Sequence, residues 1–163
     1  MPNHYWSLSA LTRHASVRER LIVALDMTDC DAALAMVGRL ANEVNIFKVG
    51  RKLFASAGPG VIREIRRRGS EVFLDLKFHD TPHRVERASI GATRLGVRMF
   101  SIHPYCKLEM MTRTRAEVAK VCRLEGLRRP EIIAVAMLAG INTASCDAAD
   151  DIADPVAHLA SYA

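Results

Sequence analysis

The sequence predicts an α/β fold built on a parallel sheet. Five apolar, β-favouring segments begin near residues 21, 44, 71, 97 and 131, and a segment of helical periodicity fills every gap between them. Strands and helices that alternate in this way form right-handed βαβ units with parallel strands. The 163 residues suffice for one domain with a sizeable core. We therefore expect a lead-in segment over 1–20 and one domain over 21–163.

Composition narrows the class of protein. Half of the residues are apolar, a quarter are charged and the net charge is +5, which is ordinary for soluble proteins. The charge permits anionic ligands such as phosphates, but it does not by itself indicate nucleic-acid binding. The four cysteines are scattered without metal-ligand spacing, and no apolar run approaches a membrane span or a signal-peptide core. We expect a cytoplasmic protein with no nucleic-acid or membrane partner.

The first strand is predicted at residues 21–25. This continuous apolar run is typical of a parallel strand that is covered on both faces. It ends at Asp26. Thr28 is a candidate cap for the next helix, because apolar residues recur at helical spacing between positions 33 and 41.

The second strand is predicted at residues 44–50 and carries one cation, Lys48. A lysine within a buried strand must find a partner for its ammonium group or lower its pKa. The alternative is a surface lysine whose charged end reaches solvent, and this stretch alone leaves both open. Gly58 and Gly60 mark a loop before a helix expected at about 61–68.

The third strand, predicted at residues 72–76, places charged residues in an apolar setting. Side chains alternate along a strand, so Phe73, Asp75 and Lys77 should point to one face. Buried charges usually persist in pairs, and paired charges in a cleft indicate a functional site. Asp80 follows just past the strand, and Pro82 should begin a helix.

The rest of the chain continues the alternation. We expect a helix over 82–95, a strand over 97–102, a helix over 108–124, a strand over 131–138, a loop over 140–154 and a short helix over 155–162. Carboxyl ends of parallel strands meet at one edge of the sheet. Four charged residues should therefore converge there: Asp26, Lys48, Asp75 and Lys77.

Three segments carry a resemblance to a known family. They are Leu25-Asp26, Phe47-Lys48-Val49-Gly50 and Asp75-Leu76-Lys77-Phe78-His79-Asp80, and a later stretch, His103-Pro104-Tyr105, follows in the same order. The chain resembles the orotidine 5'-phosphate decarboxylases, which convert orotidylate to uridylate (UMP) and carbon dioxide without a cofactor. The resemblance implies a TIM (β/α)₈-barrel type of fold with only about the first five βα units present.

The resemblance also implies roles for individual residues. Lys77 would donate a proton, Asp75 would lie near the substrate carboxylate, and Lys48 would orient the ribose and the acids. Residues matching Asp80 and Thr81 reach a neighbouring subunit's site in the family, which implies a homodimer with shared active sites. The implied catalytic residues are Lys77, Asp75, Lys48 and Asp80, and the implied nucleotide-binding residues are Asp26, Lys48, Asp75 and Thr81.

Lys48 separates this chain from metal-dependent relatives. Barrel enzymes that act on sugar phosphates share the Asp-x-Lys-x-x-Asp segment, but they usually carry a glutamate where this chain has Lys48, and they need magnesium. We therefore expect no metal. His79 and His83 are four residues apart, but Pro82 lies between them, so we do not favour a metal site there either.

Several positions depart from the family pattern. Thr81 stands where the family usually has isoleucine, Cys106-Lys107 replaces a glycine pair, and Leu138-Ala139-Gly140 lacks two hydroxyls that touch the base. The family's last three strands, with a phosphate-binding loop, have no counterpart in these residues. The alternative function is a truncated, non-catalytic paralogue that binds a nucleotide weakly or assembles with a partner.

Overall fold

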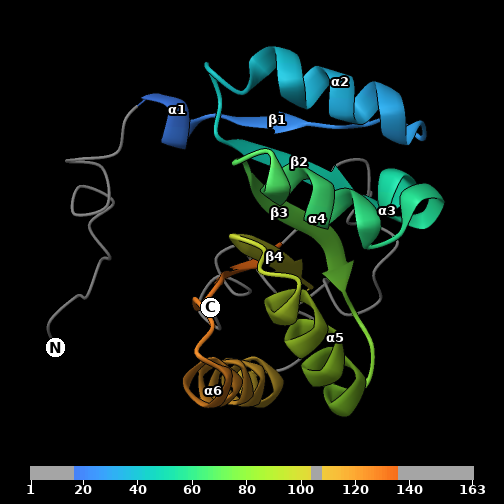
Figure 1. Ribbon diagram of the computed structural model, residues 1–163. Coiled ribbons are helices and arrows are strands. Elements are labelled where there is room, and N and C mark those ends of the chain that lie inside the picture. Colours follow the sequence, from blue (N-terminus) through green and yellow to red (C-terminus); the bar gives the residue numbers. More distant parts are fainter. Residues whose placement is uncertain (1–16, 104–107, 136–163) are drawn as a thin grey trace, which may run out of the picture.

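The computed structural model describes residues 17–103 and 108–135. The helices and strands within them alternate along the chain (Figure 1). In chain order they are α1 (Val17–Arg20), β1 (Ile22–Ala24), α2 (Cys30–Leu40), β2 (Ile46–Gly50), α3 (Arg51–Ala57), α4 (Gly60–Arg67), β3 (Glu71–Phe78), α5 (Pro82–Arg94), β4 (Met99–Ile102), α6 (Leu108–Glu125) and β5 (Glu131–Ala134).

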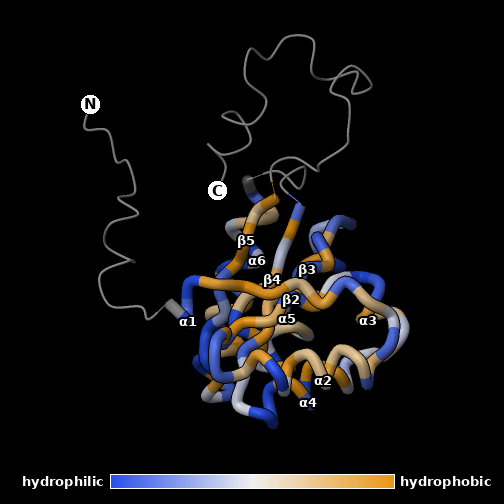
Figure 2. The backbone as a smooth tube through the Cα atoms, turned by 90° about the horizontal axis from the view of Figure 1, so that it is seen from above, coloured by the Kyte–Doolittle hydropathy of each residue, from blue (hydrophilic) through white to orange (hydrophobic). Residues whose placement is uncertain are grey.

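The five strands of the described residues form one sheet in the order β1-β2-β3-β4-β5, and every neighbouring pair is parallel. The predicted parallel α/β sheet is therefore confirmed. Each crossover leads to the adjacent strand, so successive carboxyl ends lie next to one another. The strands form the hydrophobic centre of the molecule, with α2 and α4 together on one side of them (Figure 2).

The hydrophobic core lies between the sheet and its helices. Phe47, Leu74 and Phe100 are fully buried on neighbouring strands, and Val37 of α2 and Ile62 of α4 belong to the same cluster. Burying one such side chain stabilises the fold by about 1.5–3 kcal/mol. Since alternate residues point to opposite faces, the core residues leave positions such as 48 and 75 for the other face.

Three helices differ from the prediction, and the first is α1, which lies in the expected lead-in segment. The N-cap of α2 is Asp29, whose Oδ1 accepts hydrogen bonds from the N–H groups of Asp31 at 2.8 Å and Ala32 at 3.3 Å. The expectation of Thr28 was wrong because two adjacent residues suited a cap and only the backbone path selects one. Helix α3 was not predicted, because only seven residues separate β2 from the left-handed Gly58 (φ +62°).

The remaining boundaries shift by a few residues. Strand β2 begins at Ile46 rather than 44, and β4 begins at Met99 rather than 97. The lead-in over 1–16, the end of the fifth predicted strand, and the loop and helix expected over 140–162 lie outside the described residues. In the described ranges, no helix is long and apolar enough to span a membrane.

Candidate active site

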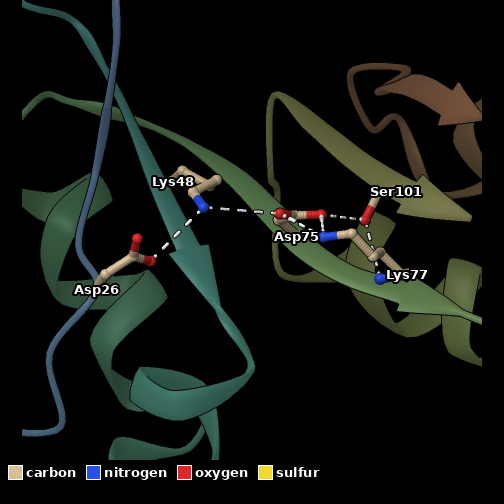
Figure 3. A network of polar contacts seen from close by, with 5 residues as sticks. All are labelled: Asp26, Lys48, Asp75, Lys77 and Ser101. Carbon is tan, nitrogen blue, oxygen red and sulfur yellow. Dashed lines mark hydrogen bonds and ion pairs between the residues drawn. The ribbon is translucent and has the colours of Figure 1, made fainter. Parts of the chain in front are cut away.

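Four charged side chains form a row across the carboxyl ends of β1, β2 and β3 (Figure 3). Lys48 Nζ lies 3.5 Å from Asp26 Oδ1 and 3.8 Å from Asp75 Oδ2. Lys77 Nζ lies 2.8 Å from both carboxylate oxygens of Asp75. The structure thus brings together Asp26, Lys48, Asp75 and Lys77 in a row whose charges alternate in sign.

The register of the sheet produces this row. Lys48 of β2 pairs with Phe73 of β3, and Gly50 pairs with Asp75. Lys48 and Asp75 therefore point to the same face of the sheet, opposite the core. The side chains of Lys48, Asp75 and Lys77 are 26%, 11% and 22% exposed, whereas Asp26 is 69% exposed. Lys48 is thus a partly buried, paired lysine rather than a surface one.

Lys77 departs from regular strand geometry. Leu74 pairs with Phe100 and Phe78 with Ile102, so β3 has three residues where β4 has only Ser101 between the same two pairs. Lys77 lies in this bulge with a φ of +51°. A non-glycine residue in the left-handed region costs about 1–3 kcal/mol, and such strain is concentrated at functional sites. The alternation seen in the sequence does not predict it.

The Asp75 carboxylate is held in its charged form. Burial favours the neutral acid and raises its pKa. Hydrogen bonds from Lys77 and Ser101, together with the positive charges of Lys77 and Lys48, outweigh burial, so the pKa of Asp75 lies below its usual value of 3.8. The ionised Asp75 therefore places a negative charge between the side chains of Lys48 and Lys77.

Sequence reasoning missed Ser101. This residue of β4 is fully buried, donates a hydrogen bond to Asp75 Oδ1 at 2.8 Å, and accepts one from the Lys77 N–H at 2.9 Å (Figure 3). A hydroxyl in the otherwise apolar strand Met99–Ile102 was the signal that would have found it.

Asp80 and Thr81 lie apart from the row. The Asp80 carboxylate, 43% exposed, accepts a hydrogen bond from the Thr81 N–H at 2.6 Å and pairs with Arg84 at 3.4 Å. The Thr81 hydrogen bond is the main reason that the pKa of Asp80 is lowered. Among the described residues, the structure does not bring Asp80 into contact with the lysines of the same chain.

His79 stacks on His103, the residue that follows β4, at a ring-centroid distance of 5.0 Å. Burial, followed by the charge of His79, lowers the pKa of His103.

No group of three or more His, Cys, Asp or Glu side chains in the described part of the chain is arranged to hold a metal ion. The departures at Cys106-Lys107 and Leu138-Ala139-Gly140 lie outside the described residues.

A parallel sheet whose strands follow one another in chain order, each joined to the next by a helix, is typical of the (β/α)-barrel proteins, whose active sites lie at the carboxyl edge where this row of charges is found. Within this class the sequence profile of one family, described as orotidine 5'-phosphate decarboxylase/HUMPS, matches residues 19–158. The chain belongs to this family.

Individual relatives agree with the family. The orotidine 5'-phosphate decarboxylase of Syntrophus aciditrophicus (strain SB) is 45% identical over 125 residues, which are 76% of this chain and 50% of that protein. The crystal structure of orotidine 5'-phosphate decarboxylase from Lactobacillus acidophilus matches with a TM-score of 0.73 and 27% identity, over 87% of this chain and 63% of that one.

A crystal structure of an uncharacterized conserved protein from Geobacillus kaustophilus matches with a TM-score of 0.76 and 29% identity, covering 86% of this chain and 67% of that chain. The chain spans about half the length of the curated relatives that it matches. The five parallel strands therefore correspond to part of a barrel.

Proposed function

We propose that this protein decarboxylates orotidine 5'-phosphate to UMP and carbon dioxide in pyrimidine nucleotide synthesis. The observation that carries the proposal is the row of Asp26, Lys48, Asp75 and Lys77 at the carboxyl edge of the sheet, in a chain that belongs to the decarboxylase family. The four scattered cysteines, which form no C-x-x-C pair, support a cytoplasmic location.

The proposed reaction needs fixed positive charge beside the reacting carbon. When carbon dioxide leaves C6 of the pyrimidine, the bonding electron pair stays on that carbon as a carbanion. Lys77 would stabilise this charge as an ammonium group and then transfer its proton to C6, which completes UMP. The two lysine ammonium groups supply the positive charge, so the proposal includes no metal and no cofactor.

The other residues of the row would place the reactants. Asp75, which contacts both lysines, would hold the Lys77 side chain beside C6. Lys48 would bind the ribose and orient the two aspartates. Asp26 is the most exposed member of the row, which suits a contact with a ribose hydroxyl of an entering nucleotide.

We further propose that the active protein is a homodimer. Asp80 would complete the charged row of the neighbouring subunit, and Thr81 would contact the neighbour's substrate. The proposal is supported by the position of both residues between β3 and α5 and by the exposure of the Asp80 carboxylate. Sedimentation of the pure protein with and without UMP tests it, and a monomer in both samples would contradict it.

The activity is tested by the ultraviolet absorbance change of orotidylate on mixing with pure protein. Wild type should turn over, whereas Lys77→Ala should lose at least about 10²–10⁴-fold in rate, the usual contribution of a general acid. Lys120→Ala is the matched control, because Lys120 is a 55% exposed lysine on α6. Full activity of Lys77→Ala would contradict the proposed role. UMP binding without turnover by wild type would favour a non-catalytic, nucleotide-binding protein.

A further inference from the structure

One hydroxyl, that of Ser101, bonds to two neighbouring members of the charged row, Asp75 and Lys77. Ser101 lies opposite the β3 bulge, at the single β4 position between the pairs Leu74–Phe100 and Phe78–Ile102. Its Oγ accepts a hydrogen bond from the Lys77 N–H and donates one to the Asp75 carboxylate. The donor and the acceptor capacity of this hydroxyl are therefore both used within the site.

The Lys77 N–H needs this acceptor. In a regular ladder a strand N–H donates to a backbone carbonyl of the neighbouring strand. Here the bulge breaks the ladder, and the Ser101 hydroxyl takes the place of the carbonyl at 2.9 Å. The N–H that makes this hydrogen bond belongs to the residue whose backbone lies in the unfavourable left-handed region, with a φ of +51°.

The direction of the hydroxyl proton follows from the same contact. Because Ser101 Oγ accepts from the Lys77 N–H, its own proton is free to point to Asp75 Oδ1 at 2.8 Å. The carboxylate then receives Ser101 on one oxygen and Lys77 Nζ on both. The backbone of Lys77 and the carboxylate that binds its side chain are thus tied to one fully buried atom.

We propose that Ser101 is a positioning residue, which holds the strained Lys77 backbone and the Asp75 carboxylate in fixed relation so that the Lys77 ammonium group remains aimed at the reacting carbon. Alanine would break both hydrogen bonds, and threonine would keep the hydroxyl. The inference rests on the proposed function for its catalytic meaning, but its structural content is measurable without turnover.

The experiment compares four proteins by nuclear magnetic resonance: wild type, Ser101→Ala, Ser101→Thr and Ser89→Ala. Ser89 is the matched control, because it is fully buried in α5 and its hydroxyl has no hydrogen-bond partner among the described residues. Two quantities are measured in each protein: the pKa of Asp75, from the carboxyl shift of isotope-labelled aspartate, and the rate of hydrogen exchange at the Lys77 amide.

We expect Ser101→Ala to raise the pKa of Asp75 and to speed exchange at the Lys77 amide by up to about tenfold, the factor that corresponds to a typical net hydrogen bond. Ser101→Thr should restore both values, and Ser89→Ala should leave both unchanged. Ser101→Cys keeps the volume but bonds weakly, so it should change both quantities in the same direction by less. If Ser101→Ala does not fold, the same two quantities are measured in Ser101→Cys instead.

Activity then separates this inference from the proposed function. If wild type decarboxylates orotidylate, the acid limb of its rate should move to higher pH in Ser101→Ala, together with the pKa of Asp75. If wild type does not turn over but the resonance changes appear, the proposed function fails while the link made by Ser101 stands. An unchanged pKa of Asp75 and unchanged exchange in Ser101→Ala would overturn the inference, whatever the activity.

Discussion

Both edges of the sheet carry carboxylates paired with cationic side chains, but the pairs at the two edges differ in how far they are exposed to solvent. At the carboxyl end, Lys48 and Lys77 share the Asp75 carboxylate, which is 11% exposed. At the amino end, Arg98 contacts Glu71 at 3.4 Å and Glu131 at 3.0 Å. Glu71 and Glu131 are 26% and 54% exposed, so this network borders on solvent.

The amino end also contains a cavity of about 360 Å³, which is many times the volume that one water molecule occupies. Its lining includes Arg94, Arg98 and Arg128, but each of these arginines already pairs with a glutamate. A cavity does not by itself mark the site of chemistry. The carboxyl end differs because its central carboxylate, Asp75, is only 11% exposed and is joined there by a strained backbone at Lys77 and a buried hydroxyl at Ser101.

The comparison therefore separates charges that link elements from charges that are positioned for a reaction. Arg98 joins the starts of three successive strands, which is a structural task, and exposed ion pairs of this kind contribute little individually. The carboxyl row lies on the face opposite the core, where nothing in the packing of the helices requires it. The predictions below remove equivalent groups from the two ends.

The largest difference is expected from removing one cation at each end. Lys48→Gln should lower kcat/KM for orotidylate by about 10²–10³-fold, as expected when a preorganised electrostatic group is lost. Arg98→Gln should leave kcat/KM close to the wild-type value, because Arg98 lies at the other edge of the sheet. Steady-state kinetics on both variants checks this, and equal losses would refute the functional contrast between the ends.

Removing one carboxylate should affect stability at the carboxyl end. Asp75→Asn deprives two partly buried lysines of their shared partner, and the free energy of unfolding should fall by about 1.5–3 kcal/mol, the range for hydrogen bonds to charged groups. Urea unfolding followed by circular dichroism measures this change. An unchanged free energy of unfolding would contradict this prediction, because it would mean that water replaces the Asp75 carboxylate as the partner of both lysines without loss.

The stability difference between wild type and Asp75→Asn should depend on pH and should decrease in acid. The folded pKa of Asp75 lies below its unfolded value, so the stabilisation is fully present above about pH 4 and is lost as the pH falls through the folded pKa. The advantage of wild type over Asp75→Asn should therefore be constant near neutral pH and shrink on acidification. Urea midpoints of both proteins over a pH series test this, and an advantage that grows in acid would contradict it.

The smallest effect is expected from Glu71→Gln at the amino end. This variant should lose at most about 1 kcal/mol of unfolding free energy, because the ion pairs of Glu71 are partly exposed. Added salt should reduce the loss, since exposed charges are screened over about 10 Å at moderate ionic strength. Repeating the urea titration at low and high salt checks this. A salt-independent loss as large as that of Asp75→Asn would remove the distinction between the ends.

Much of the site followed from local patterns. Asp75 and Lys77 are two residues apart in a β-favouring segment, so their side chains were expected to share a face. Asp26 and Lys48 ended other predicted strands, and a parallel sheet collects such ends at one edge. Helix α3 and the cap at Asp29 escaped prediction because short helices and adjacent capping residues give competing local signals.

The sequence by itself determined the alternation of strands and helices, the parallel sheet and the edge at which Asp26, Lys48, Asp75 and Lys77 gather, because periodicity and chain order are local properties. Only the tertiary structure decided that β3 bulges against β4, that Lys77 adopts a left-handed backbone and that Ser101 bonds to both Lys77 and Asp75. These features depend on the register between strands that lie more than twenty residues apart in the chain, and register is fixed by the packing of the whole sheet.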